Sequence, residues 1–180
     1  MFYCSLTENA YLKLLTPEDA EALFQATDES RAHLKEWLPF IDYTKTSEDS
    51  LNFIRSTMKQ FSDNNGIQAG IWYDGKLAGV IGFHAVNWSN KSTSLGYWLS
   101  NKFTGKGLMT LAVQAMVTHA FHTWKLHRVE IRAAEENVKS RAIPERLGFI
   151  KEGVLRDSEW LYDHFVSHVV YAMIAEDWGK

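Results

Sequence analysis

The sequence of 180 residues contains one cysteine, three prolines and no long hydrophobic run. The single cysteine, Cys4, excludes an internal disulfide framework and a zinc site with several cysteine ligands. The more apolar runs, residues 77–83 and 169–175, are far shorter than the ~20 residues that a membrane-spanning helix needs. Residues 1–10 lack the basic start and the apolar core of a signal peptide. We therefore predict a cytoplasmic protein without membrane association.

An excess of positive charge is also absent, because 19 Lys and Arg stand against 22 Asp and Glu. A domain that binds nucleic acid through a large surface usually has a basic charge balance. We therefore expect no nucleic-acid partner. With 46% hydrophobic residues, the chain should bury roughly 70% of its unfolded surface in a single core. Without repeats, low-complexity segments or a linker, residues 1–180 are predicted to form a single domain.

The hydrophobic pattern changes period along the chain. We expect strands over residues 11–15, 67–73, 76–84, 92–99, 128–133, 149–155 and 165–174. Helices are expected after Thr16, over residues 33–37, after Ser47-x-x-Ser50, and over residues 108–124 and 140–147. Asp74-Gly75 between two strand-like runs is a strong hairpin signal. This order predicts an α+β (mixed α/β) fold with a central sheet that contains an antiparallel meander.

Two of the expected helices have apolar side chains at helical spacing. In the first, the expected apolar face consists of Leu51, Ile54, Met58 and Phe61. In the second, it consists of Leu108, Leu111, Ala112, Ala115 and His119.

A loop with two glycines, residues 102–109, separates an expected strand from the longest expected helix. Glycines let the backbone approach an anion, and the helix N-terminus adds a positive end, so a pyrophosphate is the natural ligand. The loop is no Walker sequence, and the third glycine of a dinucleotide fingerprint is replaced by Thr110. A Gly-x-Gly pair also occurs in ordinary turns, and that alternative stays open.

Asn137 and Ser140 precede and begin the next expected helix, which Gly148 ends. Ser140 is a candidate N-cap, and Asn137 is a candidate turn residue. Their position one strand beyond the glycine loop makes the combination more informative than either residue alone.

In order and spacing, these segments resemble the GNAT acetyltransferase superfamily. Within it, the chain is most similar to the branch that acetylates the N-termini of ribosomal proteins, the alanine/serine type. The segments that carry the resemblance are residues 12–20, 37–40, 79–82, 95–99, Gly105-Lys106-Gly107, Asn137-x-x-Ser140, and residues 147–149, 152–156 and 176–178. The resemblance implies a GNAT-like, mostly antiparallel central sheet flanked by helices.

The resemblance also implies acetyl-CoA as cosubstrate and no metal. The family loop, [Arg/Gln]-x-x-Gly-x-Gly, cradles the pyrophosphate of coenzyme A, and Lys102 departs from it at the first position. A lysine still offers a cation, without the planar fork of arginine. The residues implied in coenzyme A binding are Trp98, Leu99, Lys102, Thr104, Gly105, Lys106, Gly107, Leu108, Met109, Asn137 and Ser140.

By the same resemblance, Ser140 is the candidate general acid that protonates the leaving thiolate. The glutamate that many members carry before the loop is absent from residues 92–95, and Leu111 replaces the glutamate common after it. Counting from Gly153, Glu159 occupies the place of a branch glutamate and is the candidate base. An ordinary solvated loop acid is the alternative. Ser167 stands where the family has a further acid.

The resemblance favours an N-acetyltransferase that acts directly on a protein N-terminal α-amine, ribosomal by analogy. Two alternatives stay open: a small-molecule amine (polyamine, amino acid or antibiotic) as acceptor, and a non-catalytic module that binds coenzyme A. A homo-oligomer is expected from the family. His164 and His168 lie on one face of an expected strand without an evident third ligand, so no metal site is predicted.

Overall fold

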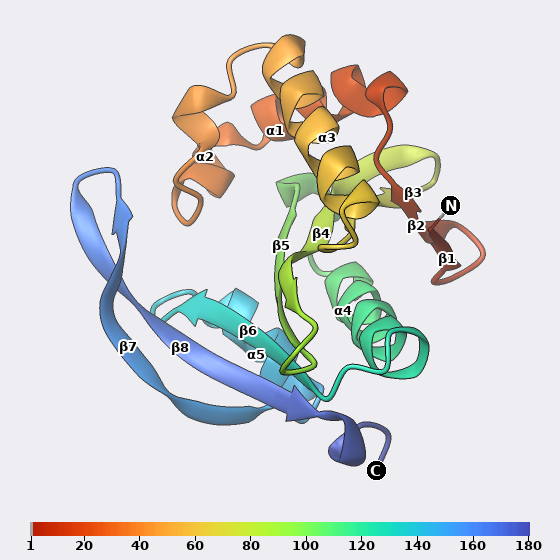
Figure 1. Ribbon diagram of the computed structural model, residues 1–180. Coiled ribbons are helices and arrows are strands. Elements are labelled where there is room, and N and C mark those ends of the chain that lie inside the picture. The colour runs from red at the N-terminus through yellow and green to blue at the C-terminus, as the bar shows by residue number, and fades with distance from the viewer. Residues whose placement is uncertain (1) are drawn as a thin grey trace. The chain divides into compact units, whose positions relative to one another are not determined.

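The computed structural model describes residues 2–180, in which eight strands form one sheet in the order β1-β2-β3-β4-β5-β6-β8-β7 (Figure 1). The strands are β1 (Tyr3–Ser5), β2 (Ala10–Leu14), β3 (Gln68–Tyr73), β4 (Lys76–Asn87), β5 (Ser92–Leu99), β6 (Arg128–Ala134), β7 (Ile150–Leu161) and β8 (His164–Ile174). Strands β5 and β6 pair in parallel, whereas β1–β2, β2–β3, β3–β4, β6–β8 and β7–β8 pair antiparallel. This mixed, mostly antiparallel sheet with helices confirms the predicted α+β class.

The chain divides into two compact units. The first runs to Gly82 and includes Tyr97–Ala112, and the second comprises Phe83–Gly96 and Val113–Lys180. The α-helices are α1 (Ala20–Glu29), α2 (Arg31–Lys35), α3 (Ser47–Ser62), α4 (Leu108–Thr118) and α5 (Val138–Arg146). Shorter helical turns cover Pro17–Asp19, Ile41–Tyr43, Asn101–Phe103, His119–Thr123 and Ala175–Asp177. Strands β4 and β5 and helix α4 contribute residues to both units.

In the first unit, local hydrogen bonds fix the start of the helical segment that follows β2. The side chain of Asp19 accepts hydrogen bonds from the backbone nitrogen and the hydroxyl of Thr16, at 2.8 and 3.0 Å. Pro17 occupies the first helical position, as predicted. The predicted β3–β4 hairpin is also present, and both of its turn residues, Asp74 and Gly75, have positive φ angles.

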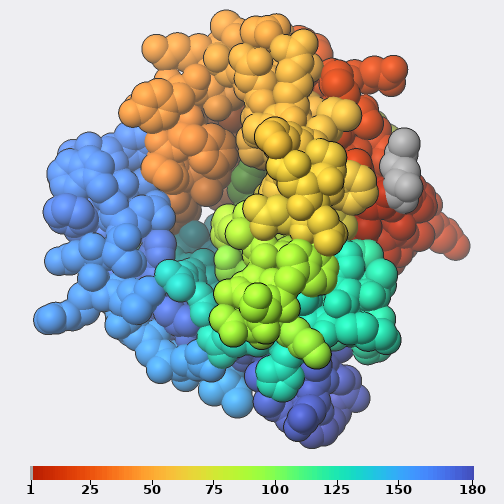
Figure 2. Space-filling view, viewed as in Figure 1, coloured from red at the N-terminus to blue at the C-terminus, as the bar shows by residue number. Residues whose placement is uncertain are grey.

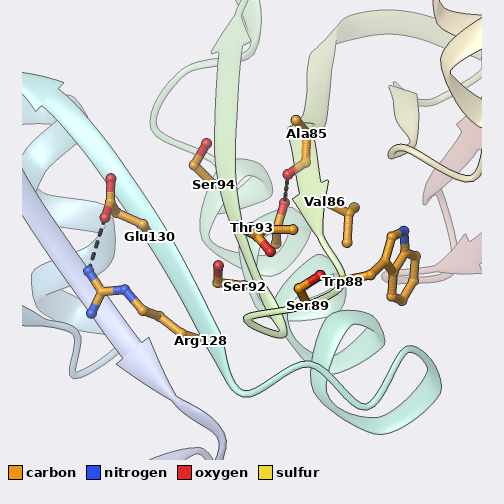
Figure 3. Close-up of a pocket in the computed structure, with 10 residues that line it drawn as sticks. Ala85, Val86, Trp88, Ser89, Ser92, Thr93, Ser94, Arg128 and Glu130 are labelled. Carbon is orange, nitrogen blue, oxygen red and sulfur yellow. Dashed lines mark hydrogen bonds and ion pairs between the residues drawn. The ribbon is translucent and has the colours of Figure 1, made fainter.

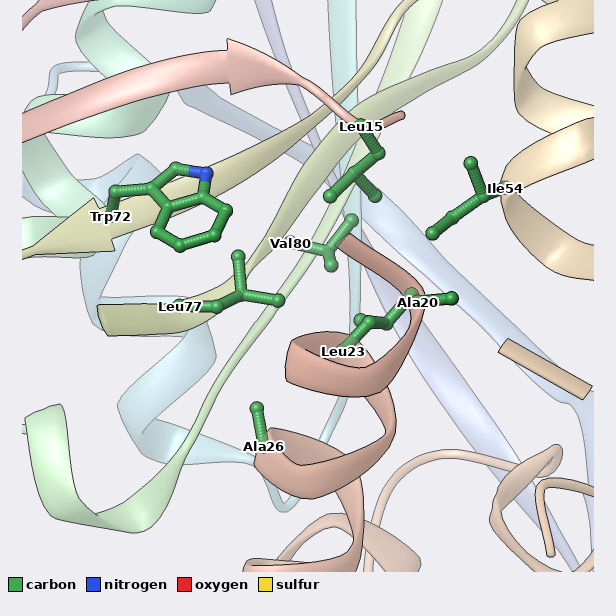
Figure 4. Packing of buried hydrophobic residues seen from close by; sticks show 8 residues of the cluster. All are labelled: Leu15, Ala20, Leu23, Ala26, Ile54, Trp72, Leu77 and Val80. Carbon is green, nitrogen blue, oxygen red and sulfur yellow. The ribbon is translucent and has the colours of Figure 1, made fainter. Parts of the chain in front are cut away.

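The core of the first unit joins the two layers of that unit, strands and helices (Figure 4). It consists of Leu15, Ala20, Leu23, Ala26, Ile54, Trp72, Leu77 and Val80. The expected apolar face of α3 is only partly correct, because Ile54 is fully buried whereas Met58 and Phe61 remain 39% and 40% exposed. The other buried positions of α3 are Ser50 and Thr57, whose small side chains allow close approach.

In the second unit, β6, β8 and β7 form an antiparallel arrangement that ends in the long β7–β8 hairpin (Figure 1). Along β6, the side chains of Val129, Ile131 and Ala133 are buried, and those of the alternating positions are more exposed. This period of two is the pattern that predicted the strand.

Several predicted boundaries differ from the structure, and two of them are wrong by six residues. The helix expected over residues 108–124 ends as an α-helix at Thr118, and His119–Thr123 form a wider π-helical turn closed by the Trp124 N–H and the His119 carbonyl at 3.2 Å. The ring of Trp124 packs against Phe83, with centroids 5.0 Å apart, a long-range contact that the local pattern does not encode. Strand β7 continues to Leu161 instead of ending at residue 155, because β8 supplies a pairing partner.

The expected apolar face of α4 is also displaced. The buried residues are Leu108, Met109, Ala112, Val113, Met116 and Val117, continued by Ala120 and Phe121. Leu111, Ala115 and His119 are only partly buried. The buried stripe is therefore rotated by about one residue from the predicted one, because the helix is apolar on most of its surface.

Within residues 2–180, no helix is long and apolar enough to cross a membrane. The extent of the domain, the cytoplasmic location and the oligomer stay predictions.

Candidate active site

The predicted site residues fall into two groups. Trp98, Leu99, Lys102 and residues 104–109 belong to the first unit, at the end of β5, in the glycine loop and at the start of α4. Asn137, Ser140 and Glu159 belong to the second unit, on α5 and β7.

Gly105 and Gly107 both adopt the left-handed backbone conformation, with φ angles of 77° and 74°. Side chains other than glycine adopt this region at a cost of roughly 1–2 kcal/mol. A Cβ added at either position would meet no atom within 4 Å, so the space above both glycines is open. The loop therefore needs glycine for its backbone conformation and leaves room for a ligand at its surface.

Helix α4 begins directly after this loop, since the carbonyl of Gly107 accepts the N–H of Leu111 at 3.1 Å. The first N–H groups of a helix, including those of Leu108 and Met109, have no acceptor within it. Both residues are buried, at 3% and 7% exposure, so their side chains are not available as ligand contacts. Such an arrangement suits an anion.

Two lysines flank the loop, and each already has a partner. The ammonium of Lys102 lies 2.7 Å from a carboxylate oxygen of Glu29 at the end of α1, and both side chains are more than half exposed. The ammonium of Lys106 lies 5.4 Å from the centroid of the Tyr73 ring. An incoming phosphate would therefore compete with Glu29 for Lys102.

The sequence pattern did not identify the contacts that hold the beginning of the loop. The hydroxyls of Ser30 and Ser100, both buried, are 2.8 Å apart. The Ser30 oxygen also accepts the N–H of Asn101 at 3.1 Å, and the Ser100 N–H donates to Ala78 at 2.7 Å. Because these residues are distant in the sequence and serine is common on surfaces, no local signal could have shown this network.

At the end of β5, the main-chain N–H and C=O groups of successive residues point alternately toward β4 and away from it. The Ser100 N–H bonds to β4, and a Cβ on Gly79 of β4 would collide with the Trp98 carbonyl oxygen. The main-chain groups of Leu99, between these two residues, therefore point away from β4. The parallel pairing of β5 with β6 covers Ser92–Leu95, so Leu99 lies beyond it.

In the second unit, Asn137 and Ser140 are joined through the start of α5. The side-chain oxygen of Asn137 accepts the Ser140 N–H at 3.2 Å, so Asn137 is the N-cap and Ser140 is not. The predicted helix end is confirmed at Gly148, which has a φ angle of 80°. The cap therefore sets the position of the Ser140 main chain at the start of α5.

Glu159 is not a loop acid, since it lies in β7 opposite Val166 of β8. Its carboxylate is 3.2 Å from Nε2 of His168, and the two side chains are only 29% and 17% exposed. His168 is a contact that the sequence pattern did not identify. In contrast, His164 pairs with the exposed Asp163, and no cluster of three metal-ligating side chains occurs in the described part of the chain.

A second histidine, His84 on β4, lies beside β5. Its Nδ1 is 2.9 Å from the hydroxyl of Ser94, and a Cβ on Gly96 would be 2.5 Å from its Nε2, so the ring packs directly on the β5 backbone. Desolvation and then the positive charge of Arg132 lower the pKa of His84 below 6.5. The imidazole is therefore mainly neutral at pH 7.

The family described as "Acetyltransferase (GNAT) domain" matches residues 10–150. "Putative ribosomal N-acetyltransferase YdaF" of Bacillus subtilis is 38% identical over 99% of this chain and 98% of the relative.

Solved structures are similar over nearly the whole chain. The structure of RimL, a "Ribosomal L7/L12 alpha-N-protein acetyltransferase in complex with Coenzyme A", has a TM-score of 0.92 at 25% identity and covers 96% of this chain and 98% of its own. The microcin C7 self immunity acetyltransferase MccE, in complex with acetyl-CoA and AMP, has a TM-score of 0.91 at 26% identity, with 94% coverage of both chains. The predicted fold is confirmed, and both neighbours hold the predicted cosubstrate or its product.

Proposed function

Because the chain belongs to the GNAT family of N-acetyltransferases, we propose that it transfers the acetyl group of acetyl-CoA to the N-terminal α-amine of a protein, of the ribosomal type. The observation that carries this proposal is the similarity, over 99% of the chain, to a relative named as a putative ribosomal N-acetyltransferase. A cytoplasmic location and a homo-oligomer accord with this function and belong to the same proposal.

The first unit is proposed to hold coenzyme A. The residues assigned to it are Trp98, Leu99, Lys102 and residues 104–109, and the open space at the two glycines, directly before a helix start, fits a pyrophosphate. The main chain of Leu99, directed away from β4, would pair with the pantetheine arm and polarise the acetyl carbonyl. Asn137 is assigned to the same arm by resemblance. Acetyl-CoA supplies an acetyl group that is activated as a thioester.

The second unit is proposed to supply the side chains that take a proton from the α-amine and give one to the leaving thiolate. At neutral pH an α-amine with a pKa of ~7.7–8.0 is mostly protonated and must lose a proton before it attacks. Glu159 accepts that proton, directly or through water, and His168 at 3.2 Å orients the carboxylate. Ser140 donates a proton to the departing sulfur.

The experiment that tests this function measures CoA release from acetyl-CoA with a panel of amines. The panel contains peptides that begin with Ser, Ala or Met, a blocked peptide with an internal lysine, and spermidine. We expect turnover only with peptides that have a free N-terminus.

Other outcomes of the panel would replace the proposal. Turnover with spermidine alone would indicate a small-molecule acceptor, an alternative supported by the AMP bound in the MccE structure. Binding of CoA without turnover of any amine would indicate a non-catalytic module.

The Lys102–Glu29 pair gives a test of the proposed phosphate contact. We expect Glu29→Gln to tighten CoA binding by about two- to threefold, because the variant releases Lys102 from an exposed ion pair worth roughly 0.2–1 kcal/mol. Lys102→Gln should weaken binding by a similar factor. Titration calorimetry with CoA measures both changes.

The control is Glu21→Gln, which removes an exposed acid from the same helix, where it accepts a hydrogen bond from Gln25. CoA affinity should stay unchanged in this variant. Equal or weaker binding by Glu29→Gln would show that Lys102 does not contact the ligand.

A further inference from the structure

One face of the sheet in the second unit carries polar side chains along β6. Because side chains alternate along a strand, Arg128, Glu130 and Arg132 share this face of β6 with the position of Ala134. The parallel register places Ser92 and Ser94 of β5 beside Arg128 and Glu130. The opposite face of β6 is buried, so this polar face is the accessible one.

At one end of this face lies an open cavity of about 630 Å³ (Figure 3). Ser92, Ser94, Arg128 and Glu130 line it from β5 and β6, and Trp88 and Ser89 line it from the β4–β5 turn. This turn, light green in Figure 2, is uncovered on the side facing the viewer. The cavity is therefore open to a ligand that continues into solvent.

The charges in the cavity balance one another. Arg128 forms a bidentate pair with Glu152, at 2.7 and 2.6 Å, and a further bond to Glu130 at 2.9 Å. Glu130 also accepts the Nε–H of Arg132 at 2.5 Å. Burial raises the pKa of Glu130, but the hydrogen bonds from Arg132 and Arg128 outweigh this and hold the pKa below 4.5.

This compensation decides which ligand chemistry fits the cavity. Since Arg128, the arginine that lines the cavity, is paired with Glu130 and Glu152, a phosphate would have to break existing ion pairs. The serine hydroxyls and the face of Trp88 instead match the amide groups and small side chains of an extended polypeptide.

Glu159 lies toward the other end of β6. The register pairs Ala134 of β6 with His168 of β8, and His168 contacts Glu159. Along β6, Glu130 and Ala134 are separated by four residues, or ~13 Å at about 3.3 Å per residue. Glu159 lies on β7, two strands from β6, which adds ~10 Å across the sheet at about 4.8 Å per strand. An extended peptide with its amine at Glu159 would therefore reach the cavity with about its fifth or sixth residue.

We propose that this cavity is a subsite for the acceptor polypeptide, about four to five residues beyond the amine that is acetylated. The inference rests on the proposed function and deepens it, because it predicts a polypeptide acceptor rather than a free small amine. The subsite selects for uncharged polar or small side chains at that position.

The test is a series of peptides with one N-terminal sequence and lengths of two, four, six and eight residues. For the unmodified protein we expect kcat/KM to rise by about tenfold or more between two and six residues and then to level off, a gain of about 1.4 kcal/mol. Ser89→Tyr, which fills the cavity from the exposed turn, should remove this gain. The dipeptide is the internal reference within each variant.

Asn90→Tyr is the matched control, because Asn90 is exposed in the same turn but does not line the cavity. It should keep the full dependence on length, and the unfolding midpoints of both variants show whether the turn is intact. A kcat/KM that does not depend on length, or an equal loss in both variants, would overturn the subsite. If no peptide of any length is acetylated, the proposed function itself fails, which is a different result.

Discussion

A Glu159→Gln variant is expected to acetylate N-terminal peptides about a hundredfold more slowly than the unmodified protein at pH 7. General bases contribute typically 10²–10⁴-fold, and glutamine keeps the shape of the side chain but cannot accept the proton. The substitution is conservative for the fold, because Glu159 is in an edge strand and its only described partner is His168 at 3.2 Å. The measurement is kcat/KM at saturating acetyl-CoA.

The pH profile separates a base from a structural residue. Above the α-amine pKa of ~7.7–8.0 the acceptor is already deprotonated, so the defect of Glu159→Gln should shrink between pH 7 and pH 9.5. Ser140→Ala, which leaves deprotonation of the amine intact, should show no such recovery. A Glu159→Gln defect that is equal at every pH would mean that Glu159 only maintains the site.

Asp163→Asn is the matched control for this experiment. Asp163 also pairs with a histidine of the same hairpin, His164 at 2.6 Å, but its side chain is 87% exposed. The two variants therefore remove the same kind of contact from the same element. Activity should be retained by Asp163→Asn at all pH values.

The double variant Gly105→Ala and Gly107→Ala is expected to weaken CoA binding by at least about thirtyfold. Both glycines have left-handed φ angles, and an alanine in that region costs roughly 1–2 kcal/mol. Two such costs sum to about 2–4 kcal/mol, or roughly 30- to 1000-fold in the dissociation constant if the loop relaxes in the free protein. Titration calorimetry with CoA measures this effect directly.

Gly75→Ala provides the control, because Gly75 has a φ angle of 74° and also has no atom within 4 Å of an added Cβ. It lies in the β3–β4 hairpin turn and has no part in the proposed loop. This variant should lose thermal stability but keep its CoA affinity. Unchanged affinity in the double variant would exclude the loop from the binding site.

Local signals predicted most of the fold. Thr16 before Pro17, Asp74-Gly75 between two strands and Gly148 after α5 each act through hydrogen bonds or φ angles within a few residues. Such effects do not depend on the rest of the molecule, so the sequence alone reveals them. The end of α4 and the length of β7 depend instead on Phe83 and β8, which are distant in the sequence.

In the candidate site, too, some features depend on neighbouring residues and others on residues that are distant in the sequence. The glycine loop could be predicted because its chemistry comes from consecutive backbone groups and a helix start. The partners of its residues could not, since Glu29 reaches Lys102 and Ser30 reaches Ser100 only after folding. His168 could not be linked to Glu159, because the strand that carries Glu159 was expected to be a loop.

The sequence by itself determined the α+β class, the order of its elements, the family resemblance and the loop proposed to bind coenzyme A. These follow from periodicity, turn residues and motif spacing, which are properties of neighbouring residues. Only the tertiary structure decided which charges are already paired, which face of β6 is open and that Glu159 lies in a strand beside His168. Those features come from strand register, which places residues of different strands in contact. The residues next to each of them in the sequence do not reveal these contacts.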